Sequence, residues 1–85
     1  MTSQYKKDLK LAMKQGKDFD ALFSAIERIS NGESLADLRQ HRLVGNYNGC
    51  FEAHITPDWL LIWKVYEDEG KIYLNRLGSH SELFG

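Results

Sequence analysis

Apolar side chains in the first thirty residues recur at the spacing of an α-helix, with polar residues between them. The pattern predicts a helix from Ser3 to about Gln15 and a second one, capped by Asp18, that runs to about Ser30. The short link at Gly16 is typical of an αα-hairpin. The apolar positions of the two helices are Tyr5, Leu9, Ala12, Met13, Phe19, Leu22, Phe23, Ile26 and Ile29.

From Cys50 onward the period changes to two, which predicts strands. Residues 50–56 alternate, residues 59–66 are nearly all apolar and therefore predict a central strand, and residues 71–77 follow a hairpin turn at 67–70. Residues 33–44 favour a helical turn leading into a loop, and residues 81–84 a final helical turn. The prediction is a single α+β domain over residues 1–85, with two N-terminal helices packed on a small antiparallel sheet.

Composition narrows the class of protein further. The chain is 42% hydrophobic and 27% charged, which excludes disorder, and it has neither a signal-peptide pattern nor a membrane-spanning apolar run. The lone Cys50 fits a reducing cytoplasm. The net charge of -1 weighs against broad nucleic-acid binding. A local basic face remains possible because five lysines gather near the first helix: Lys6, Lys7, Lys10, Lys14 and Lys17.

All three histidines, His41, His54 and His80, lie beside turns or predicted strand ends, with Asp58 after the second and Arg76 before the third. Imidazole exchanges protons near neutral pH, and guanidinium binds phosphate oxygens in a fixed fork. Such a set can cleave RNA: a base removes the 2′-hydroxyl proton, a cation stabilises the phosphoryl oxygens, and an acid protonates the departing 5′-oxygen. Metal-independent RNA cleavage is therefore a hypothesis to weigh for this set of residues.

Each residue also has an ordinary structural interpretation. His80 fits an exposed tail, Arg76 a surface ion pair, and His54 with Asp58 a structured turn. Arg42, in the cationic stretch around His41, is either a substrate contact or a polar loop residue. Trp59 either stacks on a base or belongs to the core. The histidines stand 13 and 26 residues apart without a paired-ligand motif, so we expect no metal site and no cofactor.

Two motifs carry a resemblance to a known family. They are His-x-x-x-Asp-Trp from His54 and Arg-x-x-x-His-x-x-x-Phe from Arg76, supported by the stretches 41–45, 52–63 and 76–84 and by the helical half from Gln4. Together they resemble bacterial toxins of the RelE/ParE superfamily, specifically the YafQ-like mRNA interferase branch of type II toxin–antitoxin systems.

This resemblance implies a ribosome-dependent endoribonuclease that cuts mRNA in the ribosomal A site, stops translation and is held inactive by a cognate antitoxin. It assigns proton transfer to His41, His54, Asp58 and His80, and phosphate binding to Arg76. Trp59 and Phe84 would shape or contact the substrate.

The sequence departs from the family pattern at two points, and an alternative function stays open. Family members usually begin with a strand, so either this sheet lacks one strand or the natural start lies upstream, and we expect an unpaired sheet edge that promotes association. Arg42 stands where proline is common. The alternative function is a non-catalytic or degenerate interaction module, either binding an antitoxin or inhibiting gyrase. The histidine set counts against the gyrase type.

Overall fold

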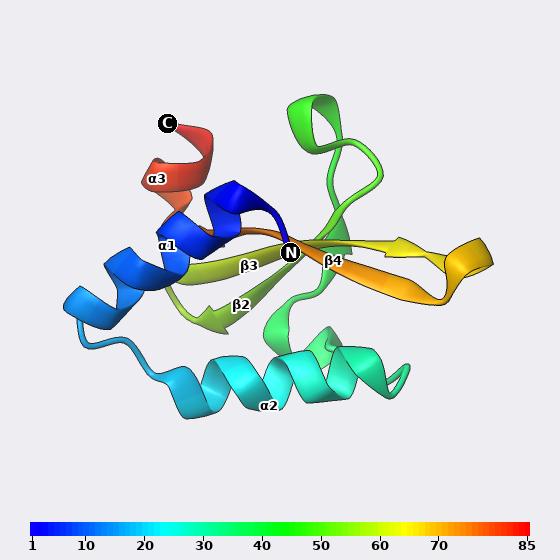
Figure 1. Ribbon diagram of the computed structural model, residues 1–85, viewed down its shortest axis with the longest axis horizontal. Helices are drawn as coiled ribbons and strands as arrows, with labels where there is room; N and C mark the ends of the chain where they lie inside the picture. The colour runs from blue at the N-terminus through cyan, green and yellow to red at the C-terminus, as the bar shows by residue number, and fades with distance from the viewer.

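The computed structural model describes all 85 residues and places three helices around a four-stranded antiparallel sheet (Figure 1). The strands follow one another in the order β1-β2-β3-β4. This confirms the α+β class and the two N-terminal helices, with one strand more than the residue pattern predicted. The elements are α1 (Ser3–Lys14), α2 (Phe19–Ser30), β1 (His41–Arg42), β2 (Phe51–Thr56), β3 (Trp59–Tyr66), β4 (Lys71–Gly78) and α3 (His80–Phe84).

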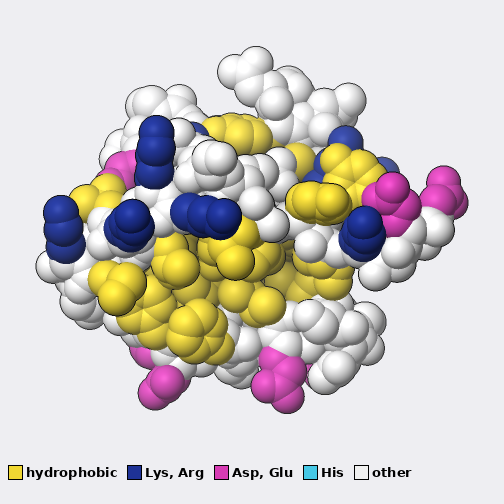
Figure 2. All heavy atoms as spheres, in the orientation of Figure 1, with side chains coloured by type: hydrophobic (Ala, Val, Ile, Leu, Met, Phe, Trp, Pro, Cys, Tyr) yellow, Lys and Arg dark blue, Asp and Glu magenta, His cyan; other side chains and the backbone are white.

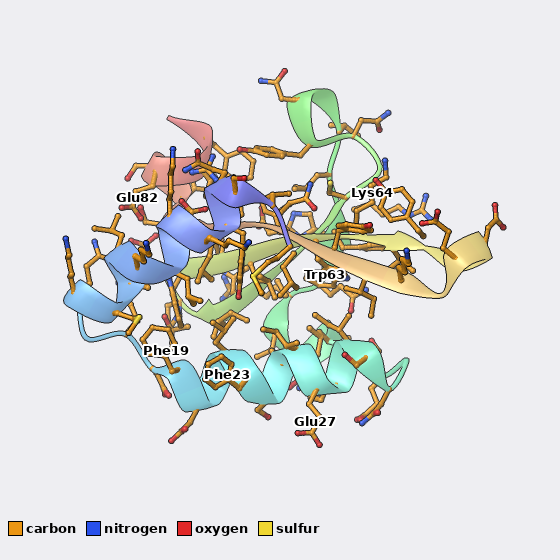
Figure 3. The ribbon with its side chains drawn as sticks, in the orientation of Figure 1. Phe19, Phe23, Glu27, Trp63, Lys64 and Glu82 are labelled. Atoms are coloured by element: carbon orange, nitrogen blue, oxygen red, sulfur yellow. The ribbon has the colours of Figure 1, made fainter.

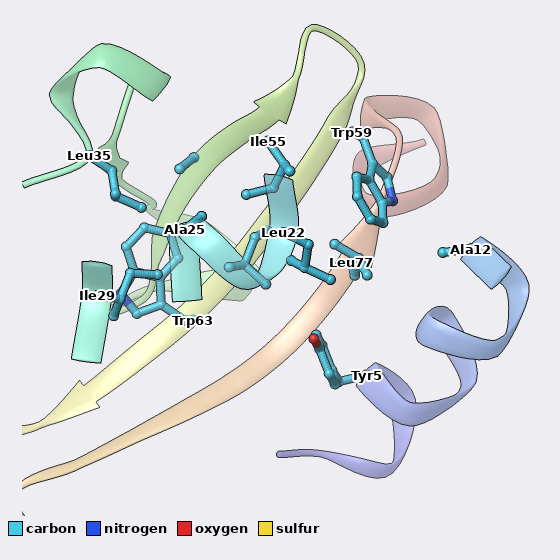
Figure 4. Close-up of a cluster of buried hydrophobic side chains, with 12 residues drawn as sticks. Tyr5, Ala12, Leu22, Ala25, Ile29, Leu35, Ile55, Trp59, Trp63 and Leu77 are labelled. Atoms are coloured by element: carbon cyan, nitrogen blue, oxygen red, sulfur yellow. The ribbon is translucent and has the colours of Figure 1, made fainter. Parts of the chain in front are cut away.

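β3 is the central strand of the hydrophobic core, as its apolar run predicted. Leu60, Leu61 and Ile62 are fully buried, which requires apolar cover on both faces of the sheet. On one face α2 contributes Leu22 and its neighbours to the larger core cluster (Figure 4). On the other face, Leu60 and Ile62 meet Leu83 of α3 and the thiol of Cys50. Burial raises the pKa of that thiol.

α1 packs against β4, the outer strand of the sheet. A strand at an edge exposes unpaired backbone groups, yet here three of them have partners. The backbone N–H of Thr2 donates to Leu74 O at 3.1 Å, and its hydroxyl donates to Asn75 O at 2.7 Å. Asp8 accepts from the backbone N–H of Leu77 at 3.0 Å. The expectation of an unpaired edge is therefore wrong where Thr2 and α1 cover β4.

The two predicted helical stripes needed correction at several positions. Met13 and Phe23 are 66% and 56% exposed, while Asp8 and Ala25 occupy buried positions instead. The reason is that each helix packs chiefly on the sheet, α1 on β4 and α2 on β2, rather than on the other helix. Figure 2 shows the resulting apolar surface with a row of basic side chains above it, and Figure 3 shows Phe19 and Phe23 within it. No helix is long and apolar enough to cross a membrane.

Helix ends follow simple capping chemistry, with one shift from the prediction. Asp18 caps α2 by accepting from Ala21 N at 3.0 Å, as predicted. Thr2, rather than Ser3, caps α1 by accepting from Tyr5 N at 3.0 Å. Ser79 and Glu82 form a capping box on α3, and this fixes where that helix begins beyond β4.

Replacing Asp8 with alanine should destabilise the fold strongly. The change leaves the Leu77 N–H without an acceptor and the partly buried Arg76 without its carboxylate, which together should cost about 3 kcal/mol of unfolding free energy. Urea unfolding followed by circular dichroism measures this loss. The matched control is Glu27→Ala, which removes an exposed carboxylate from α2 and should stay within about 0.5 kcal/mol of the unaltered chain. Equal stability of the two variants would contradict the role assigned to Asp8.

Candidate functional site

The sheet register brings most of the predicted residues onto one face, opposite α2. His41 of β1 pairs with Glu52 of β2, Glu52 with Ile62 of β3, and Ile62 with Arg76 of β4, so these four residues form one row across the sheet. Residues directly opposite one another share a face. Neighbouring strands are about 4.8 Å apart, which sets His41 and Arg76 about 14 Å apart along the row.

At the β1–β2 end of this face, two imidazoles flank one carboxylate. Oε1 of Glu52 lies 3.5 Å from Nε2 of His54 and 3.6 Å from Nε2 of His41. The Glu52 side chain is only 5% exposed, whereas those of His54 and His41 are 23% and 53% exposed. Residue spacing did not reveal Glu52 as part of the site. The signal was available in the alternation of β2, since Glu52 and His54 stand two positions apart and share a face.

At the β4 end of the face, Arg76 is held by a carboxylate from α1. Its Nε donates to Asp8 Oδ2 at 2.8 Å and its Nη2 to Asp8 Oδ1 at 3.3 Å, a two-pronged pair. This hydrogen bonding raises the pKa of the Arg76 guanidinium, so it stays cationic. Nη1 donates to the hydroxyl of Tyr47 at 3.3 Å. Three of the five guanidinium N–H groups are engaged, and two remain for a ligand.

α3, which carries His80 and Phe84, is linked to Arg76 through Tyr47. The Tyr47 hydroxyl donates to Leu83 O at 3.3 Å, and the Tyr47 ring meets the Phe84 ring edge-on at 5.6 Å. The ring of the exposed His80 lies 5.0 Å from that of Phe84. Tyr47 thus joins Arg76 to α3.

Asp58 hydrogen-bonds to the start of α3 rather than to His54. Its Oδ1 accepts from the backbone N–H of His80 at 3.4 Å, so it contacts the start of α3 instead. His54 is oriented by its own turn, because Nδ1 lies 3.2 Å from Pro57 O. The chain folds back at this turn, so Asp58 sits nearer to His80, which is 22 residues away in sequence.

Two predicted substrate contacts lie away from this face. Trp59 is 1% exposed and meets Phe19 edge-on at 5.9 Å, so its ring is unavailable for the predicted stacking on a base. Trp59 begins β3 and is a member of the larger core cluster. Arg42 lies over the Phe51 ring at 5.3 Å and lines a cleft of about 850 Å³ with Trp63. The side chains form no group of three or more ligands arranged to hold a metal ion.

The site thus has two imidazoles and one arginine on a single face of the sheet, with α3 following β4. Known proteins resemble this chain in sequence and fold. The model of the family described as "Bacterial toxin of type II toxin-antitoxin system, YafQ" matches residues 1–85. This chain belongs to the YafQ family. The mRNA interferase toxin YafQ of Escherichia coli strain K12 is 38% identical to it over 86 residues, which cover 99% of this chain and 91% of that protein.

Solved structures of the family share the fold. A metal-bound toxin from Helicobacter pylori has a TM-score of 0.90 and 36% identity, covering 98% of this chain and 93% of that chain. YafQ in the E. coli DinJ–YafQ complex has a TM-score of 0.87 and 34% identity, covering 99% and 93% of the two chains. This chain therefore has the YafQ fold over nearly its whole length.

Replacing Tyr47 with phenylalanine should loosen α3 without unfolding the domain. The variant loses the hydrogen bonds to Arg76 and to Leu83 O while keeping the ring contact with Phe84. A loss of about 1 kcal/mol of local stability should speed amide exchange at Leu83 about fivefold. Hydrogen exchange read by NMR measures it, with the exposed Tyr66→Phe as the matched control. Unchanged exchange at Leu83 in the Tyr47 variant would show that Tyr47 does not hold α3.

Proposed function

We propose that this chain is an mRNA interferase toxin, an endoribonuclease that cleaves mRNA on the ribosome and thereby inhibits translation. The observation that carries the proposal is the single sheet face with His41 and His54 at one end and Arg76 at the other, together with the exposed His80 on the helix that follows β4. Membership of the YafQ family supports it, since the E. coli relative bears the name mRNA interferase toxin. The site of action would be the cytoplasm, where translating ribosomes are.

The face supplies the groups that RNA self-cleavage chemistry requires. A base removes the proton of the 2′-hydroxyl, whose oxygen attacks the adjacent phosphorus while the bond to the 5′-oxygen breaks. An acid returns a proton to that leaving oxygen, giving a 2′,3′-cyclic phosphate and a 5′-hydroxyl. The two free N–H groups of Arg76 would hold the phosphoryl oxygens. His41, His54, Asp58 and His80 are the proton-transfer candidates, and no step requires a metal.

His80 is the residue to test first, because it is exposed, stands at the start of α3 and adjoins both Phe84 and the strand that carries Arg76. Phe84, which is 39% exposed, is the aromatic side chain placed to contact substrate. This differs from Trp59, whose contribution would be to shape the site from within the core. Arg42 would at most contact RNA away from the cleaved bond.

Replacing His80 with alanine should lower mRNA cleavage on programmed ribosomes by about 10²-fold or more, the contribution typical of a proton-transfer group. Primer extension locates the cuts, and naked RNA shows whether they require the ribosome. The neighbouring exposed Ser81→Ala should cleave normally, and circular dichroism should show both variants folded. Full cleavage by the His80 variant would contradict the assigned role. A folded chain that never cleaves but still binds its antitoxin would favour the alternative of a non-catalytic interaction module.

We further propose a cognate antitoxin as partner, by analogy with E. coli YafQ, which forms a complex with DinJ. Its contact area would include the apolar surface between α1 and α2, where Phe23 is exposed. Apolar patches of this kind, rimmed by charge, commonly mark protein interfaces. The lysines of α1 along its edge favour an amphipathic antitoxin segment that carries acidic side chains.

Replacing Phe23 with serine should weaken antitoxin binding by about tenfold or more, because an exposed aromatic anchor is lost at little cost to the fold. Calorimetry with the protein encoded by the adjacent gene measures the affinity. The matched control is the exposed apolar Val44→Ser, which lies outside this surface and should bind normally. Equal affinities for the two variants would place the antitoxin on another face.

A further inference from the structure

The carboxylate of Glu52 has only imidazoles as charge partners. It is buried on β2, and no lysine or arginine pairs with it. The cations near it in register are engaged elsewhere, since Arg42 lies over the Phe51 ring and Arg76 is paired with Asp8. A buried carboxylate is costly unless an opposite charge compensates it. In this structure that charge can come only from the two histidines.

Backbone carbonyls fix which imidazole nitrogen carries the proton. Nδ1 of His41 lies 3.0 Å from Arg39 O, and Nδ1 of His54 lies 3.2 Å from Pro57 O. A carbonyl oxygen can only accept a hydrogen bond, so both Nδ1 atoms must donate. A neutral ring with a proton on Nδ1 has a bare lone pair on Nε2, and both Nε2 atoms face Oε1 of Glu52.

Without an additional proton, three acceptors would therefore converge at one point. Two imidazole lone pairs and a carboxylate oxygen repel each other, and burial of Glu52 strengthens that repulsion. A proton on one Nε2 converts the repulsion into an ion pair. The histidine that carries it becomes an imidazolium held by Glu52 on one side and by a backbone carbonyl on the other.

We propose that Glu52 is a positioning residue that keeps at least one of His41 and His54 as an imidazolium, storing a proton and a positive charge on the face that also carries Arg76. The proposed imidazolium does not depend on the function of the protein. Its effect on mRNA cleavage rests on the proposed function. In cleavage, the stored charge would lie on the same face as the phosphate held by Arg76, about two to three strand spacings away from it.

No other group facing the pair offers the same compensation. β3 presents Leu60 and Ile62 to this face, both apolar. The small cavity beside His54, about 220 Å³, is also lined by Asp37 and Arg39. Asp37 is already paired with Arg28 at 2.6 Å, and Asp58 contacts the backbone of His80. Glu52 is thus the carboxylate available to both rings.

Imidazole nitrogen spectra test the proposal directly. Two-bond proton–nitrogen correlations on the whole ¹⁵N-labelled chain at pH 7 distinguish a neutral ring from an imidazolium. We expect both Nδ1 atoms to be protonated and at least one of the two rings to be an imidazolium. In Glu52→Gln, whose amide can donate to Nε2, both rings should become neutral. Two neutral rings in the unaltered chain, or an imidazolium that persists in Glu52→Gln, would overturn the proposal.

Two further variants separate charge from structure. Glu69→Gln removes an exposed carboxylate at the β3–β4 hairpin and should leave the imidazolium signals unchanged. Glu52→Asp keeps the charge on a shorter side chain and should retain an imidazolium. If Glu52→Gln does not fold by circular dichroism, the spectra of the unaltered chain and of Glu52→Asp still decide between an imidazolium and two neutral rings.

The pH profile of mRNA cleavage tests the effect on the reaction. A nearby opposite charge stabilises the protonated ring, so its loss in Glu52→Gln should move the alkaline limb of the profile to lower pH by about one unit. An unmoved limb would overturn the role of Glu52 in cleavage, even with the expected spectra. If the unaltered chain does not cleave at all, the proposed function fails, and the spectra still decide the protonation state.

Discussion

One buried carboxylate on the first helix joins the fold to the site. Asp8 closes the outer edge of β4 by accepting the Leu77 N–H, and it fixes the guanidinium of Arg76 with two hydrogen bonds. A short helix with many lysines is only marginally stable in isolation, so α1 depends on its tertiary contacts. The same contacts orient Arg76, which shares a sheet face with the two imidazoles. Stability and arrangement of the site therefore depend on a single ion pair between α1 and β4.

A second buried carboxylate has the corresponding position at the opposite end of the same face. Glu52 faces His41 and His54 much as Asp8 faces Arg76. Arg76 and the pair of imidazoles are thus each backed by a buried carboxylate. Buried carboxylates limit how far the groups above them can move, since any departure leaves a charge without a partner. A small domain with a thin core can in this way fix polar side chains without a large hydrophobic scaffold.

The sequence predicted those parts of the structure that depend on local patterns. The apolar run of β3, the Asp18 cap and the turn at 67–70 follow from periodicity and turn chemistry. β1 was missed because two residues contain no period and their pairing depends on contacts with β2. Met13 and Phe23 were misplaced because helical spacing does not show whether two helices pack on each other or on a sheet.

The sequence predicted most of the residues of the candidate site, but it did not predict how their side chains are arranged in space. The motifs gathered the histidines and Arg76, whereas Asp8 lies 68 residues from Arg76 in sequence and reads as an ordinary surface acid in a lysine-rich helix. Trp59 shows the converse, since a side chain inside a motif turned out to be buried. Long-range contacts decide both cases.

Both described ends of the chain lie close to the strand that carries Arg76, and this bears on how the protein can be labelled. Thr2 is hydrogen-bonded to Leu74 and Asn75, and Gly85 ends the short helix that begins two residues after β4. A tag at either end would therefore adjoin the site. The turn at 67–70 is exposed, polar and at the far end of the β3–β4 hairpin (Figure 1). Exposed turns of this kind tolerate insertion best, so a fluorophore or affinity peptide belongs there.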